Sequence, residues 1–248
     1  MIVEGVYILI AFGLSFICAL WFFIEEEVII VLGSSSSARK YILDKAQIEY
    51  TFISPEIDEQ SISYVTPKQY VLDVAKAKAE ALKPIFKGVK CILVTADQIV
   101  VGSGVYEKPK NRSEAKRFLK SYSNSTVSTI TGLVVVNMKN GFTTKQTDIS
   151  TIEFDEITDK DIEQILNPDY PIDVWEKTTN YLFLPGFIPL AKKIKEESRE
   201  KVNVFDCCGA LAVEHPALYK RVKRITGSYS SILGLSLPLM IELIEEVK

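Results

Sequence analysis

Residues 28–40 read VIIVLGSSSSARK, an apolar run that breaks at Gly33 into four serines and then reaches Arg39 and Lys40. The apolar run predicts a buried strand, and the turn after it brings hydroxyls, backbone N–H groups and two cations to one point. In α/β proteins, ligands bind in the crevice at the carboxyl ends of strands, where a small-residue turn into a helix can hold an anion. The stretch therefore predicts either a phosphate pocket or an ordinary strand-to-helix turn with a serine as N-cap.

The composition is that of a globular protein of one large or two small domains, since 47% of the 248 residues are hydrophobic and 25% are charged. A net charge of −3 without a block of Lys or Arg argues against binding to a nucleic acid polymer. The four cysteines lack metal or redox spacing, which indicates reduced thiols in an intracellular compartment. His215 is the single histidine, so carboxylates must hold any metal, which favours a hard ion such as Mg²⁺.

Residues 5–24 carry no charge and are followed by three glutamates. A run of roughly twenty uncharged residues is long enough to cross a bilayer as a helix. Because it lacks a basic n-region and a small-residue cleavage site, an uncleaved membrane anchor is favoured over a secretory signal. Arg39 and Lys40, the nearest cations, would keep the globular part cytoplasmic. The alternatives are a hydrophobic helix packed on the domain and residues added by a misassigned start codon.

Strands and helices are predicted to alternate along the rest of the chain. A hairpin turn at Asn140-Gly141 is expected to join the last two of the predicted strands. This order predicts an α/β (α+β) fold with a mixed sheet. The expected helices cover residues 38–47, 67–82, 113–122, 159–166 and the end of the chain from Pro238, and the expected strands cover 28–32, 50–54, 91–101, 126–138 and 147–154.

Two acidic residues and three cations are candidates for chemistry. Asp97 ends a buried run, where a carboxylate can project into a crevice, and the strand that continues after it argues against a simple turn. Glu56 lies in a proline-fixed turn and is either a second oxygen ligand or a solvated charge. Arg39, Lys78 and Lys108 are either ligands for polyphosphate oxygens or surface cations. Together they are typical of phosphoryl-transfer chemistry without a P-loop.

Seven motifs also follow one another in the order of a known family: GSSSSARK (33–40), PEIDE (55–59), AKAKA (75–79), ADQ (96–98), EKP (107–109), TG (131–132) and GLSLP (234–238). The chain thereby resembles the Maf family of nucleoside triphosphate pyrophosphatases, once described as septum-formation inhibitors, over most of residues 28–171 and 206–245. The resemblance implies an elongated, mixed twisted sheet flanked by helices, with two lobes around a cleft, similar to inosine triphosphate pyrophosphatases. It also implies hydrolysis of a nucleotide between its α and β phosphates.

The resemblance implies a role for each catalytic candidate. Asp97 matches the proton acceptor, and Glu56 with Asp97 would hold a divalent cation, Mg²⁺ or Mn²⁺. Arg39, Lys78 and Lys108 would stabilise charge on the phosphate oxygens.

The substrate-binding residues that the resemblance implies are Ser34, Ser36, Ala38, Gln98 and Glu214. Ser34 and Ser36 would add hydroxyl donors, and the absence of the family's loop proline and aromatic argues against base stacking at Ala38. Gln98 and Glu214 resemble the branch that acts on 7-methyl-GTP, whereas the dTTP/UTP branch usually has Thr and Gln there. A carboxylate can accept from the N1–H and N2 amine of guanine and favours the positive charge of a methylated ring.

We therefore expect a hydrophobic segment at 1–27 and a Maf-like domain at 28–248, with an insertion at 173–206 that has no family counterpart. The expected activity is that of a metal-dependent nucleoside triphosphate diphosphatase acting on a modified nucleotide such as 7-methyl-GTP. A dTTP/UTP pyrophosphatase and a nucleotide-binding or division-regulating protein without turnover are the alternatives. A cytoplasmic location is expected, and membrane association through residues 5–24 and a homodimer are left open.

Overall fold

One mixed sheet organises the residues that the computed structural model describes, 28–168 and 203–248. Its seven strands follow the order β2-β1-β3-β5-β6-β7, and β4 pairs with β3 beside this path. The β2-β1-β3 pairings are parallel and the others are antiparallel, which confirms the predicted α/β fold with a mixed sheet. The bounds are β1 Ile29–Gly33, β2 Tyr50–Phe52, β3 Cys91–Val101, β4 Val105–Tyr106, β5 Thr126–Asn137, β6 Thr143–Phe154 and β7 Val222–Thr226.

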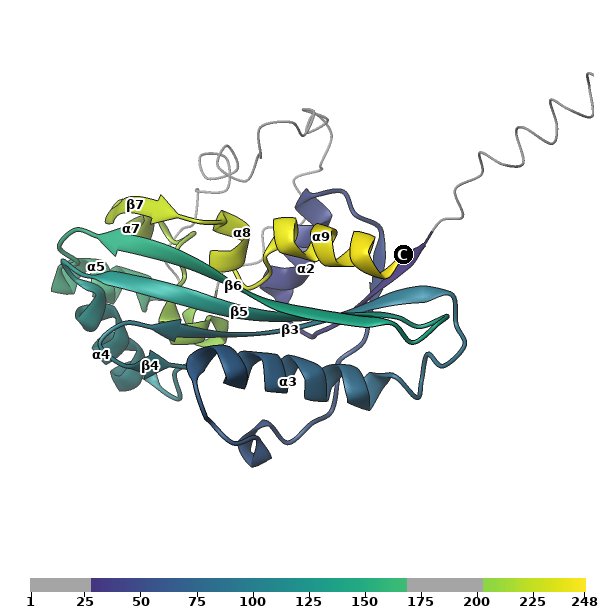
Figure 1. Ribbon diagram of the computed structural model, residues 1–248. Helices are drawn as coiled ribbons and strands as arrows, with labels where there is room; N and C mark the ends of the chain where they lie inside the picture. The colour runs from purple at the N-terminus through teal and green to yellow at the C-terminus, as the bar shows by residue number, and fades with distance from the viewer. Residues whose placement is uncertain (1–27, 169–202) are drawn as a thin grey trace, which may run out of the picture.

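Helices cover both faces of this sheet, as Figure 1 shows. Helix α3 (Pro67–Leu82) lies along one face, and α2 (Ser37–Lys45), α8 (Tyr229–Ile232) and α9 (Leu237–Val247) lie on the other. Three further helices gather at one end of the sheet: α4 (Arg112–Tyr122), α5 (Asp159–Ile165) and α7 (Pro216–Tyr219). Short 3₁₀ helices lie in the connections: η1 (Glu59–Ser61), η3 (Val204–Asp206) and η4 (Cys208–Ala210).

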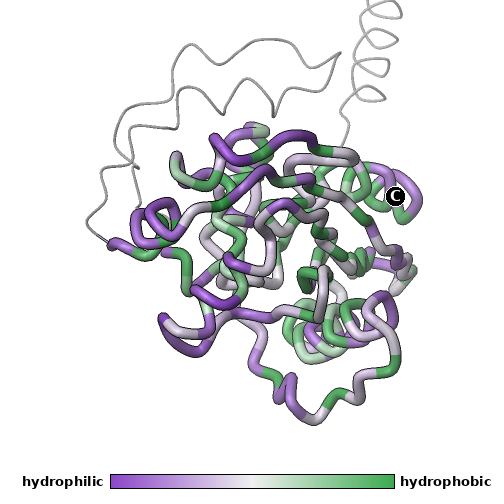
Figure 2. The backbone as a smooth tube through the Cα atoms, turned by 90° about the vertical axis from the view of Figure 1, so that its left-hand side faces the viewer, coloured by the Kyte–Doolittle hydropathy of each residue, from purple (hydrophilic) through white to green (hydrophobic). Residues whose placement is uncertain are grey.

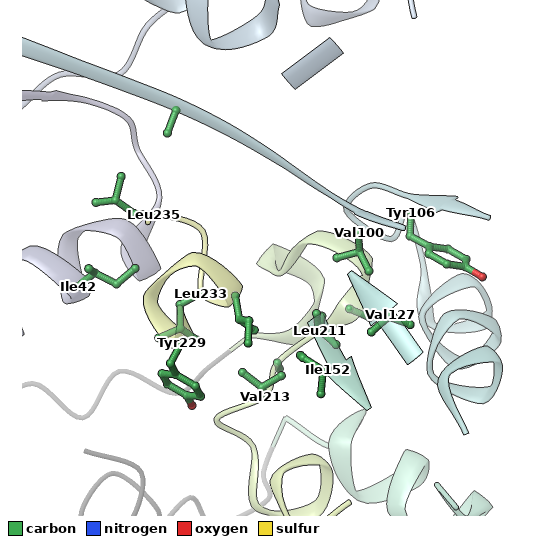
Figure 3. Packing of buried hydrophobic residues seen from close by; sticks show 14 of the residues in the cluster. Ile42, Val100, Tyr106, Val127, Ile152, Leu211, Val213, Tyr229, Leu233 and Leu235 are labelled. Carbon is green, nitrogen blue, oxygen red and sulfur yellow. The ribbon is translucent and has the colours of Figure 1, made fainter. Parts of the chain in front are cut away.

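The largest apolar core joins parts of the chain that are far apart in sequence. Leu211 and Val213, which follow η4, share it with Val127 of β5, Ile152 of β6 and Leu233 (Figure 3). Hydrophilic stretches lie mainly on the outer turns in Figure 2, as expected when apolar burial drives folding. This packing fixes the segment after η4, and with it the position of Glu214, which follows Val213.

Helix α3 packs unusually close to the sheet. Thr66 caps its N-terminus, with Oγ1 accepting from the Gln69 N–H at 3.2 Å, and Pro67 occupies the first turn. On the sheet side, Thr95 Oγ1 donates to the Ala75 carbonyl at 2.7 Å. A Cβ at Gly132 would lie 2.6 Å from the carbonyl carbon and oxygen of Val71, so only glycine allows this approach.

Most of the predicted elements are present, and the short elements β4, α7 and α8 were not predicted. The Asn140-Gly141 hairpin joins β5 and β6 as predicted, and Gly141 supplies the left-handed backbone, at φ 78°. Strand β6 begins at Thr143, earlier than predicted, because its exposed first residues continue the ladder with β5. Strand β7 is not among the predicted strands, since its charged sequence VKRIT forms a partly exposed edge.

The hydrophobic segment 1–27, including the predicted anchor at 5–24, lies outside the described residues, as does the predicted insertion except for its last four residues. In the part of the chain that the structure describes, no helix combines the length and hydropathy that a bilayer crossing requires.

Candidate active site

A cavity of about 990 Å³ opens at the carboxyl end of β1. This volume lies near the upper end of the roughly 300–1,000 Å³ that ligand pockets span. The serine turn, α2, the middle of β3, the loop after β2 and the segment around η4 all contribute to its lining. The cavity brings together nearly all of the residues that the sequence singled out: Ser34, Ser36, Ala38, Arg39, Lys78, Asp97, Gln98, Lys108 and Glu214.

The serine turn both caps α2 and lines the cavity. Ser36 is the N-cap, and its Oγ accepts from the Arg39 N–H at 3.4 Å. Ser34 Oγ accepts from the Ser36 N–H at 3.2 Å and from Arg39 Nη1 at 3.1 Å. Because a hydroxyl that accepts can still donate, Ser34 retains an O–H for a ligand. The two alternatives for this stretch, a helix cap and an anion pocket, are therefore compatible in one structure.

Arg39 is held rigidly at the base of the cavity. Its side chain is buried, and Nε donates to the Gly234 carbonyl at 2.8 Å. Gly234 has a φ of 115°, which presents that carbonyl at a turn that side-chain-bearing residues rarely adopt. Burial lowers the pKa of Arg39, and the negative charges of Asp97, Cys208 and Glu59 partly offset this effect. A fixed guanidinium is suited to phosphate oxygens because its donors are planar and pre-oriented.

Lys78 connects two carboxylates across the cavity. Its Nζ lies 2.8 Å from Asp97 Oδ1 and 2.8 Å from Glu59 Oε1. The side chains of Lys78 and Asp97 are only 11% and 14% exposed, whereas that of Glu59 is 49% exposed. The inner pair is therefore a feature of the cavity floor, and Glu59 reaches it from the loop that projects below α3 in Figure 1.

Burial raises the pKa of Asp97 above its ordinary value, while Lys78 and Arg39 act in the opposite direction. A carboxylate with a raised pKa is a stronger proton acceptor than a solvated one. This environment suits Asp97 to proton transfer better than an ordinary strand-end aspartate.

The structure does not bring Glu56 to the cavity. Glu56 is exposed and is not among the lining residues, whereas Glu59, three positions later, is. Asp58 caps η1 by accepting from the Gln60 N–H at 3.1 Å, and this turn sends Glu59 toward Lys78. Sequence reasoning missed Glu59 because both glutamates follow Pro55, and only the Asp58 cap distinguishes them.

Glu214 and Gln98 also line the cavity. Burial raises the pKa of Glu214 to about 7. Gln98 Nε2 donates to Thr131 Oγ1 at 3.0 Å and to the Ser231 carbonyl, so its amide is fixed. Tyr41 also lines the cavity, although the sequence did not single it out, and Glu214 contributes to raising the pKa of its hydroxyl. Besides its cations, the cavity therefore offers one buried carboxyl, one fixed amide and one aromatic ring.

Over residues 28–168 and 203–248, no three His, Cys, Asp or Glu side chains converge in a way that could hold a metal ion. A protein-only metal cage is therefore not a feature of the described region.

The fold and the site define an α/β protein with a cavity prepared for an anionic ligand at a helix N-terminus. Comparison with protein families matches residues 29–175 and 187–247 to the family described as Maf-like protein. The chain belongs to the Maf family. Between the two matched segments, residues 176–186 are unmatched, whereas the rest of the predicted insertion at 173–206 lies within the match.

The chain spans most of the length of the curated relatives that it matches. A Dictyostelium discoideum protein named 7-methyl-GTP pyrophosphatase is 29% identical over 87% of this chain and 95% of that protein. A protein of the same name from Idiomarina loihiensis is 35% identical over 57% of this chain and 72% of that protein. A protein from Alkaliphilus metalliredigens named dTTP/UTP pyrophosphatase is 31% identical over 57% of this chain and 73% of that protein.

Among solved structures, a HAM1 protein from Coxiella burnetii aligns with a TM-score of 0.34 at 15% identity, covering 52% of this chain and 73% of that chain.

Proposed function

We propose that this Maf-family protein hydrolyses a nucleoside triphosphate between its α and β phosphates, releasing the monophosphate and pyrophosphate. The convergence of Asp97, Lys78 and Arg39 on one cavity is the observation that carries the proposal. The names of the relatives support the same class of reaction.

Asp97 is the proton acceptor in this mechanism. A water molecule attacks the α-phosphorus, its proton passes to Asp97 Oδ, and the bond to the bridging oxygen of the β-phosphate breaks. The raised pKa of Asp97 favours this transfer, and Lys78 at 2.8 Å keeps the carboxylate oriented. General-base catalysis of this kind contributes about 10²- to 10⁴-fold in rate.

The cations stabilise the charge that develops on the leaving group. Arg39 and the α2 N-terminus face the phosphate chain from one side, and Lys78 faces it from the other. Lys108 is exposed at the rim of the cavity and would reach the outer oxygens. Ser34 and Ser36 add hydroxyl donors. Such donors act strongly because they are positioned before the reaction begins.

The donor set fits a divalent cation that is shared with the substrate. Asp97 and Glu59 each lie 2.8 Å from Lys78 Nζ, so both carboxylates lie beside the same ammonium group. Mg²⁺ commonly takes one or two carboxylates together with substrate phosphates and water, so a protein-only cage is not required. Glu59 replaces Glu56 as the partner of Asp97. When bound, Mg²⁺ or Mn²⁺ would neutralise phosphate charge and lower the pKa of a coordinated water.

The buried end of the cavity selects the base. Glu214 can accept from the N1–H and N2 amine of guanine, and its charge favours the cationic 7-methylated ring. Gln98, held by Thr131 and Ser231, offers its carbonyl oxygen in a fixed position. We therefore propose 7-methyl-GTP as the preferred substrate, with dTTP or UTP as the alternative that other relatives' names suggest.

The proposal is tested by incubating the purified protein with 7-methyl-GTP, GTP, dTTP, UTP and ITP, with Mg²⁺ or Mn²⁺, and measuring the nucleotide and phosphate products. We expect 7-methyl-GMP and pyrophosphate in equal amounts. Release of single phosphates would overturn the site of cleavage, and absence of turnover with every substrate would overturn the activity.

A matched variant examines the base end of the cavity separately. Glu214→Gln replaces a carboxylate by an amide of nearly equal size. We expect the ratio of kcat/KM for 7-methyl-GTP over UTP to fall at least tenfold, since the lost contact is charge-assisted. An unchanged ratio would show that Glu214 does not contact the base.

A further inference from the structure

The cavity extends past the serine turn to the edge strand β2, beyond the residues that the proposed mechanism uses. Its lining in this direction includes Lys40 and Asp44 of α2, Tyr50 of β2, and Ser54 and Pro55 of the following loop. We call this part the outer arm and include in it Phe52, which does not line the cavity itself but lies against the lining residue Lys40. It lies on the side of Arg39 away from Glu214, because Lys40 and Asp44 face β2, whereas Tyr41 faces Glu214.

Two contacts between α2 and β2 shape the outer arm. Lys40 Nζ lies 3.6 Å from the centroid of the Phe52 ring. Burial, together with Asp44 one helical turn later, raises the pKa of the Tyr50 hydroxyl to about 12. Residues four apart share a helix face and residues two apart share a strand face, so these two pairs form one continuous wall.

Phe52 is placed where a ligand leaving the serine turn would pass. It pairs with Leu32 in the parallel ladder, directly before Gly33 and the serine turn. Its side chain remains 53% exposed although it is a large apolar group on a strand. With Lys40 above part of the ring, the outer arm presents an ammonium group and open aromatic surface side by side.

A triphosphate that ends at its γ-phosphate would not use both the Lys40 ammonium and the Phe52 ring. A terminal phosphate would need the ammonium of Lys40 but not an aromatic surface beside it. A phosphate chain that continues into a second nucleoside would use both, because phosphates pair with cations and bases stack on aromatic rings.

We propose that the outer arm binds the second nucleoside of a dinucleoside polyphosphate, so that such compounds are substrates as well as simple triphosphates. This inference rests on the proposed pyrophosphatase activity. The first base lies at Glu214, the phosphates pass Asp97 and the serine turn, and the second base stacks on Phe52.

The reaction is the same hydrolysis with a larger leaving group. Water attacks the α-phosphorus of the first nucleoside, its proton passes to Asp97, and the bond to the bridging oxygen breaks. A compound that joins 7-methylguanosine to adenosine through three phosphates would give 7-methyl-GMP and ADP. No oxidant, reductant or second substrate is required.

The test uses the full chain with Mg²⁺ and two pairs of probes, 7-methyl-GTP with its adenosine-linked dinucleoside triphosphate, and UTP with the corresponding uridine compound. We expect the dinucleotide of the preferred base to be cleaved to a monophosphate and ADP, with kcat/KM within tenfold of the matching triphosphate. Cleavage of the triphosphate alone would overturn the outer-arm assignment and leave the proposed function standing. Cleavage of neither compound would overturn both.

Phe52→Ala separates the two ligands. Truncation should reduce kcat/KM for the dinucleotide about tenfold, as loss of one base–aromatic stack does, and change the value for the triphosphate less than twofold. Phe142→Ala is the matched control, because Phe142 is 54% exposed, much as Phe52 is, but precedes β6 at the β5–β6 hairpin instead of lying against Lys40. Phe52→Trp should retain dinucleotide cleavage. Equal effects of Phe52→Ala on both ligands would count against stacking.

Discussion

Gly132 of β5 pairs with Asp97 of β3, and the same glycine lies against the backbone of Val71 in α3. Lys78 is two helical turns after Val71, so the closeness of α3 to the sheet at Gly132 fixes the reach of Lys78 to Asp97. The geometry of the Lys78–Asp97 ion pair thus depends on Gly132 of β5, which has no side chain to hold α3 away from the sheet.

The first prediction concerns this approach. Gly132→Ala would place a Cβ 2.6 Å from backbone atoms that cannot rotate away, so α3 must move. We expect a loss of about 2–3 kcal/mol in the free energy of unfolding, measured in urea, and a larger fall in turnover as Lys78 shifts. Gly104→Ala is the control, since its new Cβ would meet nothing closer than 3.7 Å. Equal stability of the two variants would contradict the close-packing argument.

Asp97→Asn should abolish proton transfer while preserving the shape of the side chain. We expect kcat to fall about 10²- to 10⁴-fold. In the wild type, the acid limb of the pH–rate profile should lie above 3.8, the ordinary pKa of an aspartate, because burial raises the pKa of Asp97. Asp73→Asn, on the exposed side of α3 where Asp73 accepts from Gln69, is the control and should keep full activity. Wild-type rates in Asp97→Asn would rule out its role as base.

Glu56 and Glu59 provide a matched pair within one loop. Glu59→Gln should raise the Mg²⁺ concentration needed for half-maximal activity at least tenfold, because it removes one of two carboxylates that meet at Lys78. Glu56→Gln should change this concentration less than twofold, since Glu56 is exposed and does not line the cavity. The measurement is a metal titration of turnover, and a reversed order of the two variants would restore Glu56 as the ligand.

Glu214 should make the stability of the protein depend on pH. Its pKa is about 7 in the folded chain against 4.5 ordinarily, so folding favours the protonated form. Below pH 4.5 Glu214 is protonated in both the folded and the unfolded chain, so it takes nothing from the free energy of unfolding. As pH rises through about 7, the free energy of unfolding falls by about 3 kcal/mol. Glu214→Gln should not show this loss. Urea unfolding at pH 5 and pH 8 measures the difference, and parallel pH dependence of the two proteins would contradict the buried carboxyl.

The arrangement of strands and helices was largely predictable from the sequence. Apolar runs, the Thr66-Pro67 cap and the Asn140-Gly141 turn each act locally, so their signals are read in a short window. Strand β7 was not predictable in this way, because its pairing with β6 compensates for a sequence that is charged and only partly buried.

The site was predictable where a motif fixes the backbone. Arg39 follows the serine turn and Asp97 lies within a buried strand, so the local backbone fixes where each side chain lies. Glu59 depends on a single turn of 3₁₀ helix, which a reading of charge and proline alone does not reveal. Tyr41 lines the cavity near Glu214, and Phe52 lies against the lining residue Lys40; both depend on contacts between separate elements, which no local pattern reports.

The lysine that joins two carboxylates has a consequence for how a polyanion arrives. Asp97 and Glu59 each carry one negative charge, and Lys78 and Arg39 each carry one positive charge, so the four groups are electroneutral together. A bare polyanion gains no net long-range attraction from them, and its counterion has to accompany it. These four groups should therefore make the rate of capture depend less on ionic strength than four cations in the same places would.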